Sequence, residues 1–74
     1  MKHKLRAVME RYGHNQSDLA NLLGITTQSV SIKINEKKDF TRTEIMKIIY
    51  TYNLTADEVI DIFFNTKDRY KKDI

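Results

Sequence analysis

The 74-residue chain has no cysteine and no proline, and its only glycines are Gly13 and Gly24. Without cysteine no disulfide can form. No run of apolar residues exceeds three, so no segment could span a bilayer or act as a signal peptide. No stretch alternates between apolar and polar residues for long enough to predict a strand. These absences favour a cytoplasmic protein with an all-α fold and no membrane partner.

The chain also lacks the groupings of residues that catalysis and metal binding require. Its two histidines, His3 and His14, are not accompanied by a set of further ligands, which argues against a metal site. There is no glycine-rich phosphate loop, and no histidine is grouped so as to place a base beside a nucleophile. We therefore expect no enzyme, no catalytic residue and no cofactor.

Positive charge is concentrated in the first half of the chain, although the formal net charge is only +3. Residues 1–38 carry seven lysines and arginines against three acidic residues, a net charge of +4. Residues 39–74 carry six against seven, a net charge of −1. A phosphate-facing surface would produce this asymmetry, but so would a chance scatter of surface lysines.

One domain is expected over residues 1–65, because a chain of this length can build a single small core. Residues 2–12 predict a first helix that ends at Gly13, and residues 66–74 are a charged tail without a pattern, which we expect to fray. The buried face of the first helix shows helical spacing and consists of Leu5, Val8, Met9 and Tyr12.

The stretch from Asn15 to Asn35 predicts two short helices joined by a tight turn. Asn15 and Thr26 are candidate N-caps, and Gly24 stands where the first helix must end with positive φ. The first of the two helices has an apolar stripe of Leu19, Ala20, Leu22 and Leu23, and Val30 and Ile34 turn one edge of the second helix inward. Its outer face carries small uncharged side chains, which suit the edges of base pairs: Thr27, Gln28, Ser31 and the apolar Ile32.

Two capping boxes predict the last two helices of the domain. Thr41 with Glu44 opens a fourth helix after a polar loop that Phe40 anchors, and Thr55 with Glu58 opens a fifth at about residues 56–65. The expected buried residues of the fourth helix are Ile45, Ile48, Ile49 and Tyr52.

The fifth helix has two apolar stripes, which suggests two partners. Val59, Ile62 and Phe63 share one stripe, and Ile60 and Phe64 form a second one about 100° away. One hypothesis is that the second stripe binds another copy of the chain. The alternative is that the first and fourth helices wrap the fifth. The residues assigned to dimerisation are Ile60, Phe63 and Phe64.

The motif resembles the helix-turn-helix core of the lambda-type phage repressor and Cro family, also called the XRE or Cro/CI-type family. The matching residues are Asn15-Gln16, Leu19-Ala20, Gly24, Thr26 and Gln28-Ser29-Val30. The resemblance covers residues 3 to about 65, and the order of the elements is similar to that of small one-domain members from phages and mobile elements of Gram-positive bacteria. It implies a compact five-helix lambda-repressor-like domain whose second and third helices form the motif.

The resemblance also implies roles for individual residues. Base reading in the major groove would fall to Thr27, Gln28, Ser31 and Ile32, since Gln can bond adenine and Thr or Ile can pack on a thymine methyl. Contacts to the DNA backbone would come from Asn15, Gln16, Thr26, Ser29, Lys33, Asn35, Lys37, Lys38, Thr41 and Arg42.

Two positions depart from the pattern of this family. Glu36 stands where many relatives have glycine directly after the asparagine that closes the third helix. Lys33 stands where several relatives have a buried apolar residue, so its stem could pack while its amine reaches solvent or a phosphate.

The function that the resemblance implies is that of a sequence-specific DNA-binding transcriptional regulator. A Cro-like repressor that binds a pseudo-palindromic operator as a homodimer is the leading expectation, with double-stranded DNA as partner and no small-molecule effector. One alternative is the antitoxin of a toxin–antitoxin pair. Another is a protein-binding module that kept the fold without DNA binding.

Overall fold

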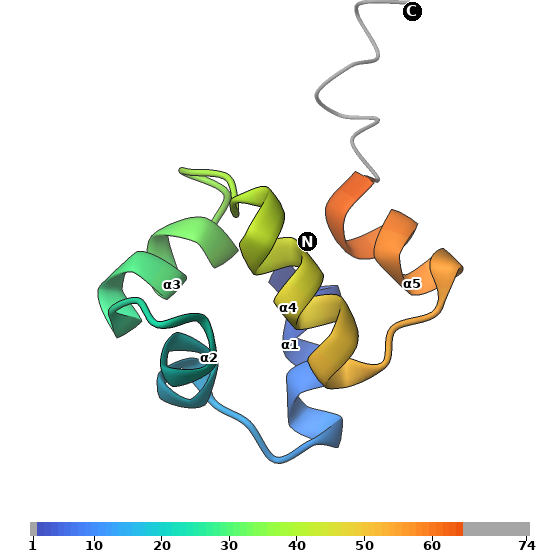
Figure 1. The fold of residues 1–74 in the computed structure, drawn as a ribbon, viewed down its shortest axis with the longest axis horizontal. Helices are drawn as coiled ribbons and strands as arrows, with labels where there is room; N and C mark the ends of the chain where they lie inside the picture. The colour runs from blue at the N-terminus through green and yellow to red at the C-terminus, as the bar shows by residue number, and fades with distance from the viewer. Residues whose placement is uncertain (1, 65–74) are drawn as a thin grey trace, which may run out of the picture.

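A computed structural model of the protein describes residues 2–64, and this part of the chain contains helices and no strand. The predicted all-α class is confirmed. The predicted tail at 66–74 and the predicted helix end at residue 65 lie outside the described residues. The elements, drawn in Figure 1, are α1 (Lys2–Arg11), α2 (Gln16–Leu23), α3 (Thr27–Ile34), α4 (Arg42–Tyr52), α5 (Ala56–Val59) and a π-helix, η1 (Ile60–Phe64), that continues α5 directly.

The helices α2 to α5 begin at the predicted caps. In each, the side-chain oxygen of the cap accepts a hydrogen bond from the backbone N–H three residues on, which satisfies a donor that the helix itself cannot. The four caps are Asn15, Thr26, Thr41 and Thr55. Asp18, Glu44 and Glu58 complete capping boxes at α2, α4 and α5. Side-chain chemistry within four residues therefore decides where these helices start.

The helices α1 to α4 each close on a residue in the left-handed conformation. These residues are Gly13 (φ 70°), Gly24 (φ 72°), Glu36 (φ 63°) and Asn53 (φ 49°). After each one, the next N–H donates to the carbonyl five residues earlier: His14 to Met9 (2.9 Å), Ile25 to Ala20, Lys37 to Ile32 and Leu54 to Ile49 (3.1 Å each). Glycine and asparagine tolerate this conformation, whereas a glutamate is strained in it.

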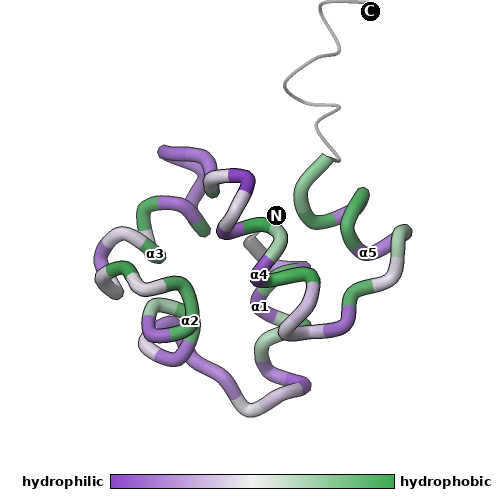
Figure 2. Tube along the Cα trace, viewed as in Figure 1, coloured by the Kyte–Doolittle hydropathy of each residue, from purple (hydrophilic) through white to green (hydrophobic). Residues whose placement is uncertain are grey.

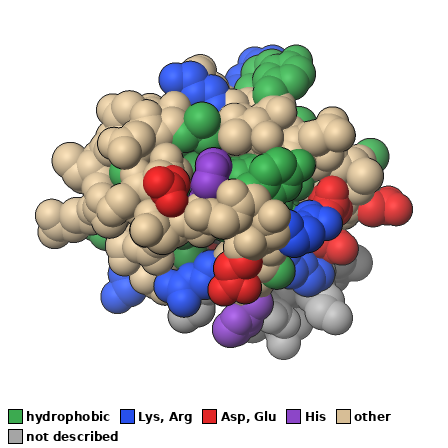
Figure 3. Space-filling view, turned by 90° about the horizontal axis from the view of Figure 1, so that it is seen from below, with side chains coloured by type: hydrophobic (Ala, Val, Ile, Leu, Met, Phe, Trp, Pro, Cys, Tyr) green, Lys and Arg blue, Asp and Glu red, His purple; other side chains and the backbone are tan. Residues whose placement is uncertain are grey.

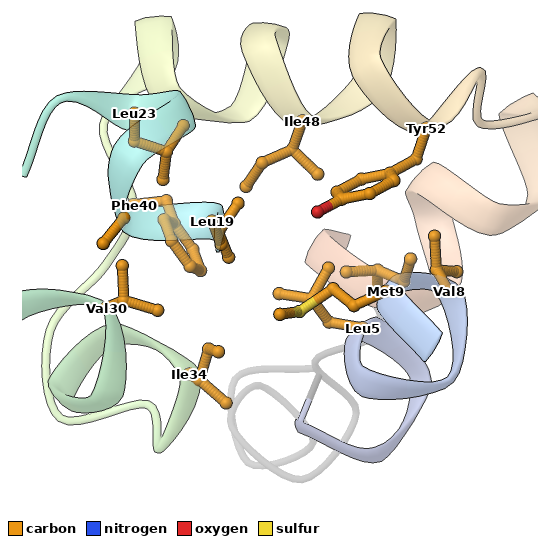
Figure 4. Close-up of a cluster of buried hydrophobic side chains, with 12 residues drawn as sticks. Leu5, Val8, Met9, Leu19, Leu23, Val30, Ile34, Phe40, Ile48 and Tyr52 are labelled. Atoms are coloured by element: carbon orange, nitrogen blue, oxygen red, sulfur yellow. The ribbon is translucent and has the colours of Figure 1, made fainter. Parts of the chain in front are cut away.

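A single core fills the space between the helices. Figure 4 shows side chains from α1, α2, α3 and α4 pointing toward one another, with Phe40 from the loop between α3 and α4 among them. Ile62 of η1 joins the same cluster. Phe40 therefore anchors its loop as predicted, and the inward stripes predicted for α1, α2 and α3 are buried, apart from Tyr12 and Leu22.

Tyr12 is not a core residue, contrary to the prediction. Because α1 ends at Arg11, Tyr12 lies in the following turn with 47% of its surface exposed. Its hydroxyl donates to the carbonyl oxygen of Tyr52 (2.9 Å), and its ring packs edge-on against the Tyr52 ring. The Nδ1 atom of His14 lies 2.8 Å from the Tyr52 hydroxyl oxygen. These three rings tie the α1–α2 turn to the end of α4.

The last helical segment is held against α1. η1 packs on α1, and two ion pairs join these parts of the chain: Lys4 with Asp61 (3.6 Å) and Arg11 with Glu58 (2.7 Å). The change from α- to π-helical winding at Ile60 was not predicted. Figure 2 shows that this segment is largely apolar although it lies at the edge of the molecule.

Candidate nucleic-acid interface

The pair formed by α2 and α3 is built on a three-residue turn. Gly24 takes positive φ, Ile25 is half-buried and Thr26 caps α3. The two helices contact each other closely, and α2 also packs on α4. Because the inner faces of both helices lie in the core, their outer faces are held in a fixed orientation. The sequence therefore places a helix-turn-helix at the surface, at one end of the long axis of the molecule (Figure 1).

The outer face of α3 presents the residues that were predicted to read bases. Thr27, Gln28 and Ile32 are exposed, and Ser31 is half-buried. Within residues 2–64 no hydrogen bond holds the Gln28 amide, so both its donor and its acceptor groups are available. The Thr27 hydroxyl oxygen lies 3.5 Å from that of Ser17, which links the start of α3 to α2. Gln28 and Ile32, one turn apart, are thus the side chains best placed to contact a ligand.

Asn35 is already engaged within α3. Its Nδ2 atom donates to the carbonyl oxygen of Ser31 (2.9 Å) and lies 3.4 Å from the Ser31 hydroxyl oxygen. The remaining amide oxygen is an acceptor and cannot bond a phosphate. A contact from the Asn35 amide to the DNA backbone would have to use its second N–H, which lies near the Ser31 hydroxyl. In the structure, Asn35 is the C-cap of α3, directly before Glu36 takes positive φ, and its amide is bonded to Ser31.

The predicted contacts at the start of α2 surround a shallow depression of about 300 Å³. Gln16 is half-buried there, and the Asn15 side chain is used as the cap, with its Oδ1 accepting from the Asp18 N–H at 3.0 Å. Arg6 of α1 lines the same depression, close to the N-terminus of α2. Sequence reasoning missed Arg6 because it lies ten residues before Gln16 in the chain, and only the fold brings it to the same depression.

Two of the predicted contacts serve the start of α3. The Thr26 hydroxyl accepts from the Ser29 N–H (3.1 Å), and its O–H donates to the Ser29 hydroxyl oxygen (3.0 Å). Ser29 is half-buried, whereas Thr26 is exposed. The Ser29 hydroxyl hydrogen is therefore free of the Thr26 bond and can donate outward.

The loop after α3 is basic and exposed. Lys37, Lys38 and Arg42 are all at the surface, and Thr41 caps the exposed start of α4. Backbone N–H groups at a helix start carry partial positive charge and can bond an anion. Figure 3 shows that the end of the molecule formed by α2 and α3 is covered mainly by uncharged polar side chains and backbone, with acidic groups mostly elsewhere on this face.

Lys33 does not reach solvent, and this corrects the predicted backbone contact. Only 8% of its surface is exposed, and its Nζ atom lies 2.7 Å from Oε1 of Glu44. Burial alone would raise the pKa of the Glu44 carboxyl, but hydrogen bonds from Lys33 and from the Thr41 N–H outweigh burial and lower this pKa. The ion pair is therefore intact at neutral pH and joins α3 to α4.

The residues assigned to dimerisation fall into two groups. Ile60 and Phe64 are 54% and 60% exposed, so the described part of the chain leaves the second apolar stripe uncovered. Phe63 packs inward instead, with its ring edge-on to Phe40 at 6.2 Å between centroids, so it lies with the core-facing stripe although it was also assigned to dimerisation. The start of the fifth helix at the Thr55 cap is as predicted.

Residues 2–64 show neither a group of metal-ligand side chains nor a helix suited to spanning a membrane. In this range no three His, Cys, Asp or Glu side chains gather as metal ligands would. None of the helices described here has the length and apolar character needed to cross a membrane.

Comparison with known proteins identifies a family but no activity. Searches of curated proteins and of solved structures found no match to the chain. A family model described as "Protein of unknown function (DUF739)" matches residues 2–66, which include every helix of the structure. The chain therefore belongs to the DUF739 family.

Proposed function

We propose that this protein is a sequence-specific DNA-binding transcriptional regulator, a Cro-like repressor acting in the cytoplasm. The observation that carries the proposal is the outer face of α3, where Thr27, Gln28 and Ile32 are exposed on a helix fixed by the core. Solvated helices usually carry lysine and glutamate on such a face. Small uncharged side chains and a free amide suit base edges instead.

In the proposed complex, α3 lies in the major groove. The Gln28 amide bonds an adenine through N6 and N7, and Ile32 packs on a thymine methyl. Lys37, Lys38 and Arg42 neutralise phosphates, and the start of α4 offers its N–H groups to the same strand. The protein acts by occupying the operator and carries out no covalent chemistry.

A homodimer completes the proposed site. Ile60 and Phe64 form an exposed apolar patch, and apolar side chains at this density on a small domain favour burial against a partner. Two copies related by a two-fold axis would place two α3 helices in successive major grooves, roughly 34 Å apart. The operator would then be pseudo-palindromic.

The resemblance to the lambda-type repressor and Cro family supports the same proposal. Glu36, which replaces the glycine of many relatives, takes φ 63°, a value that glycine adopts without strain. The turn after α3 thus keeps the backbone conformation that a glycine would give.

A protein-binding module is the second candidate, favoured by the exposed apolar side chains outside α3. Met46 and Tyr50 are exposed on α4, in addition to Ile60 and Phe64. An antitoxin would combine both properties, since it binds DNA and a protein partner. The test below separates DNA binding from protein binding alone.

Selection of bound sequences from random double-stranded DNA tests the proposal. We expect an enriched sequence with two related half-sites, since a dimer reads the same bases twice. Recovery of random sequences only, at physiological salt, would contradict sequence-specific DNA binding and favour the protein-binding module.

The Gln28→Ala variant tests base reading by α3. It should weaken binding to the selected site by about 1–3 kcal/mol and relax the preference at one position of each half-site. Binding to random DNA should not change. Asn21→Ala, an exposed amide on α2, is the matched control and should behave as wild type. Equal losses on selected and random DNA would count against base reading by Gln28.

A further inference from the structure

Two glutamates in this fold have the same local role but different surroundings. Glu44 and Glu58 both complete a capping box with a threonine, and both accept a bond from a basic residue of another helix at 2.7 Å. The pair of Glu44 with Lys33 is buried, with side chains 11% and 10% exposed. The pair of Glu58 with Arg11 lies at the surface, with side chains 31% and 58% exposed.

The buried pair joins α3 to α4 at a single atom. Oε1 of Glu44 accepts from Nζ of Lys33 at 2.7 Å and from the backbone N–H of Thr41 at 2.9 Å. Lys33 belongs to the last turn of α3. It directly follows Ile32, which lies on the outer face of this helix, whereas Lys33 itself is buried. Thr41 caps α4. One carboxylate oxygen therefore links the helix that would read bases to the helix start that would meet a phosphate.

The same lysine also contacts the loop and, through it, η1. Its Nζ atom lies 6.0 Å from the centroid of the Phe40 ring, and this ring stands edge-on to Phe63 of η1. A cation over a ring face and two rings at right angles are both attractive arrangements with a defined geometry. The end of α3 is thus linked to α4 directly and, through Phe40, to the segment that carries Ile60 and Phe64.

Stability alone does not account for a buried ion pair. Desolvation of the two charges offsets much of their attraction, and apolar or neutral replacements of similar volume often leave a protein as stable or more so. An ion pair with hydrogen bonds is directional, whereas apolar contacts are not. Only one arrangement of the two charged groups satisfies the hydrogen bonds of both. A methionine in place of Lys33 would fill the space in several rotamers.

We infer that the Lys33–Glu44 ion pair is a positioning device, which sets α3 at the depth and angle from which its outer face reads DNA. The inference rests on the proposed function. Lys33 and Glu44 touch no base in this arrangement, and they act through Gln28 and Ile32. Contacts in a recognition site depend on positions held to within about half an ångström, so loss of the pair weakens selective contacts more than phosphate contacts.

The test compares two doubly substituted proteins that lose the same charges. Lys33→Met with Glu44→Gln neutralises the buried pair, and glutamine keeps the capping box because its amide oxygen still accepts from the Thr41 N–H. Arg11→Met with Glu58→Gln makes the same change at the surface pair. Folding is checked by circular dichroism and urea unfolding. Affinity is then measured for the selected site and for random DNA of equal length.

We expect both proteins to fold and to keep the wild-type affinity for random DNA. The ratio of selected-site to random-site affinity should fall by about tenfold or more when the buried pair is neutralised, a loss equal to that of one good base contact. It should not change when the surface pair is neutralised.

An unchanged ratio in the protein without the buried pair would overturn the inference and leave the proposed function intact. An equal decrease of the affinity ratio in both doubly substituted proteins would also overturn the inference, because burial of the ion pair would then make no difference. A wild type with no sequence preference would overturn the proposed function itself, and the inference with it.

If the buried double variant does not fold, the Lys33→Arg variant replaces it in the test. The larger, planar guanidinium of arginine should displace the end of α3 and lower the ratio while the charge pair is kept, and an unchanged ratio would again overturn the inference.

Discussion

At the scale of single residues, Glu36 is the one helix-closing residue whose type does not suit its conformation. The other three are glycines and an asparagine, and Glu36 shares their positive φ. A side chain with a Cβ in the left-handed region costs about 1–2 kcal/mol. The hydrogen bonds from the Glu36 N–H to Lys33 and from the Lys37 N–H to Ile32 hold the strained residue in place.

Glu36→Gly should therefore have a free energy of unfolding about 1 kcal/mol higher than that of Glu36→Ala, because both variants lose the glutamate side chain and only glycine has no Cβ to strain at this φ. Urea unfolding measures the change. Glu36→Ala is the matched reference, since it removes the same side-chain interactions and keeps the strained Cβ. The explanation fails if both variants shift the unfolding midpoint by the same amount.

The carboxyl of Glu44 predicts how stability depends on pH. Its pKa lies below the ordinary value of 4.5 in the folded protein, since its bonds to Lys33 and Thr41 outweigh the effect of burial. A lowered folded-state pKa contributes stability that is present above the unfolded pKa and is lost as the pH falls through the folded pKa. The free energy of unfolding of wild type should fall below about pH 4.5 more steeply than that of Glu44→Gln. Urea titrations from pH 7 to pH 3 compare the two slopes, and parallel curves would contradict this account.

At the scale of helices, amphipathic patterns predicted which faces are buried better than they predicted how deeply. Leu19 and Leu22 belong to one predicted stripe, but Leu19 is fully buried whereas Leu22 is half-buried at its edge. Sequence spacing gives the direction of a side chain around its helix. The depth of burial depends on where α1 and α4 lie, which the spacing does not contain.

Leu19→Ala should lower the free energy of unfolding by about 2–5 kcal/mol, because it leaves a cavity that neighbouring side chains enclose completely. Leu22→Ala should cost less, since part of its side chain already faces solvent and leaves a smaller cavity. Urea unfolding of both variants at one temperature gives the comparison. An equal cost at the two positions would show that the packing of α2 differs from the structure.

At the scale of the whole molecule, the two regions proposed to matter for function lie at different ends. The α2–α3 pair occupies one end of the long axis, and α5 with η1 occupies the other (Figure 1). Phe40 and Phe63 connect them through the core. A dimer formed through η1 would therefore carry its α3 helices outward, as reading of two half-sites requires.

Phe64→Glu should abolish dimer formation if the exposed stripe is the interface, because a charge buried there would lack a partner. Sedimentation equilibrium should show a dimer for wild type at high concentration and a monomer for the variant. Tyr50→Glu, an exposed aromatic on α4, is the control and should stay dimeric. A wild type that stays monomeric at high concentration would rule out this interface in solution.

Much of the fold was predictable because helix starts and ends are local. The caps at Asn15, Thr26, Thr41 and Thr55 lie within three residues of the N–H groups they bond, so sequence spacing alone located them. The outer face of α3 was predictable for the same reason. The wider winding at Ile60 has no local signal that we recognise.

The tertiary structure decided the residues whose partners are remote in the chain. Lys33 looked like a phosphate contact until the fold placed Glu44, eleven residues on, beside its amine. Arg6 lies in the depression at the start of α2. The Tyr12 hydroxyl donates to the Tyr52 carbonyl oxygen, and the Phe63 ring packs edge-on against Phe40. By itself the sequence determined the helices, their caps and the face that α3 presents, since these depend on neighbours within a turn or two. Only the packing of helices against one another decided which charged and aromatic side chains were left for a partner.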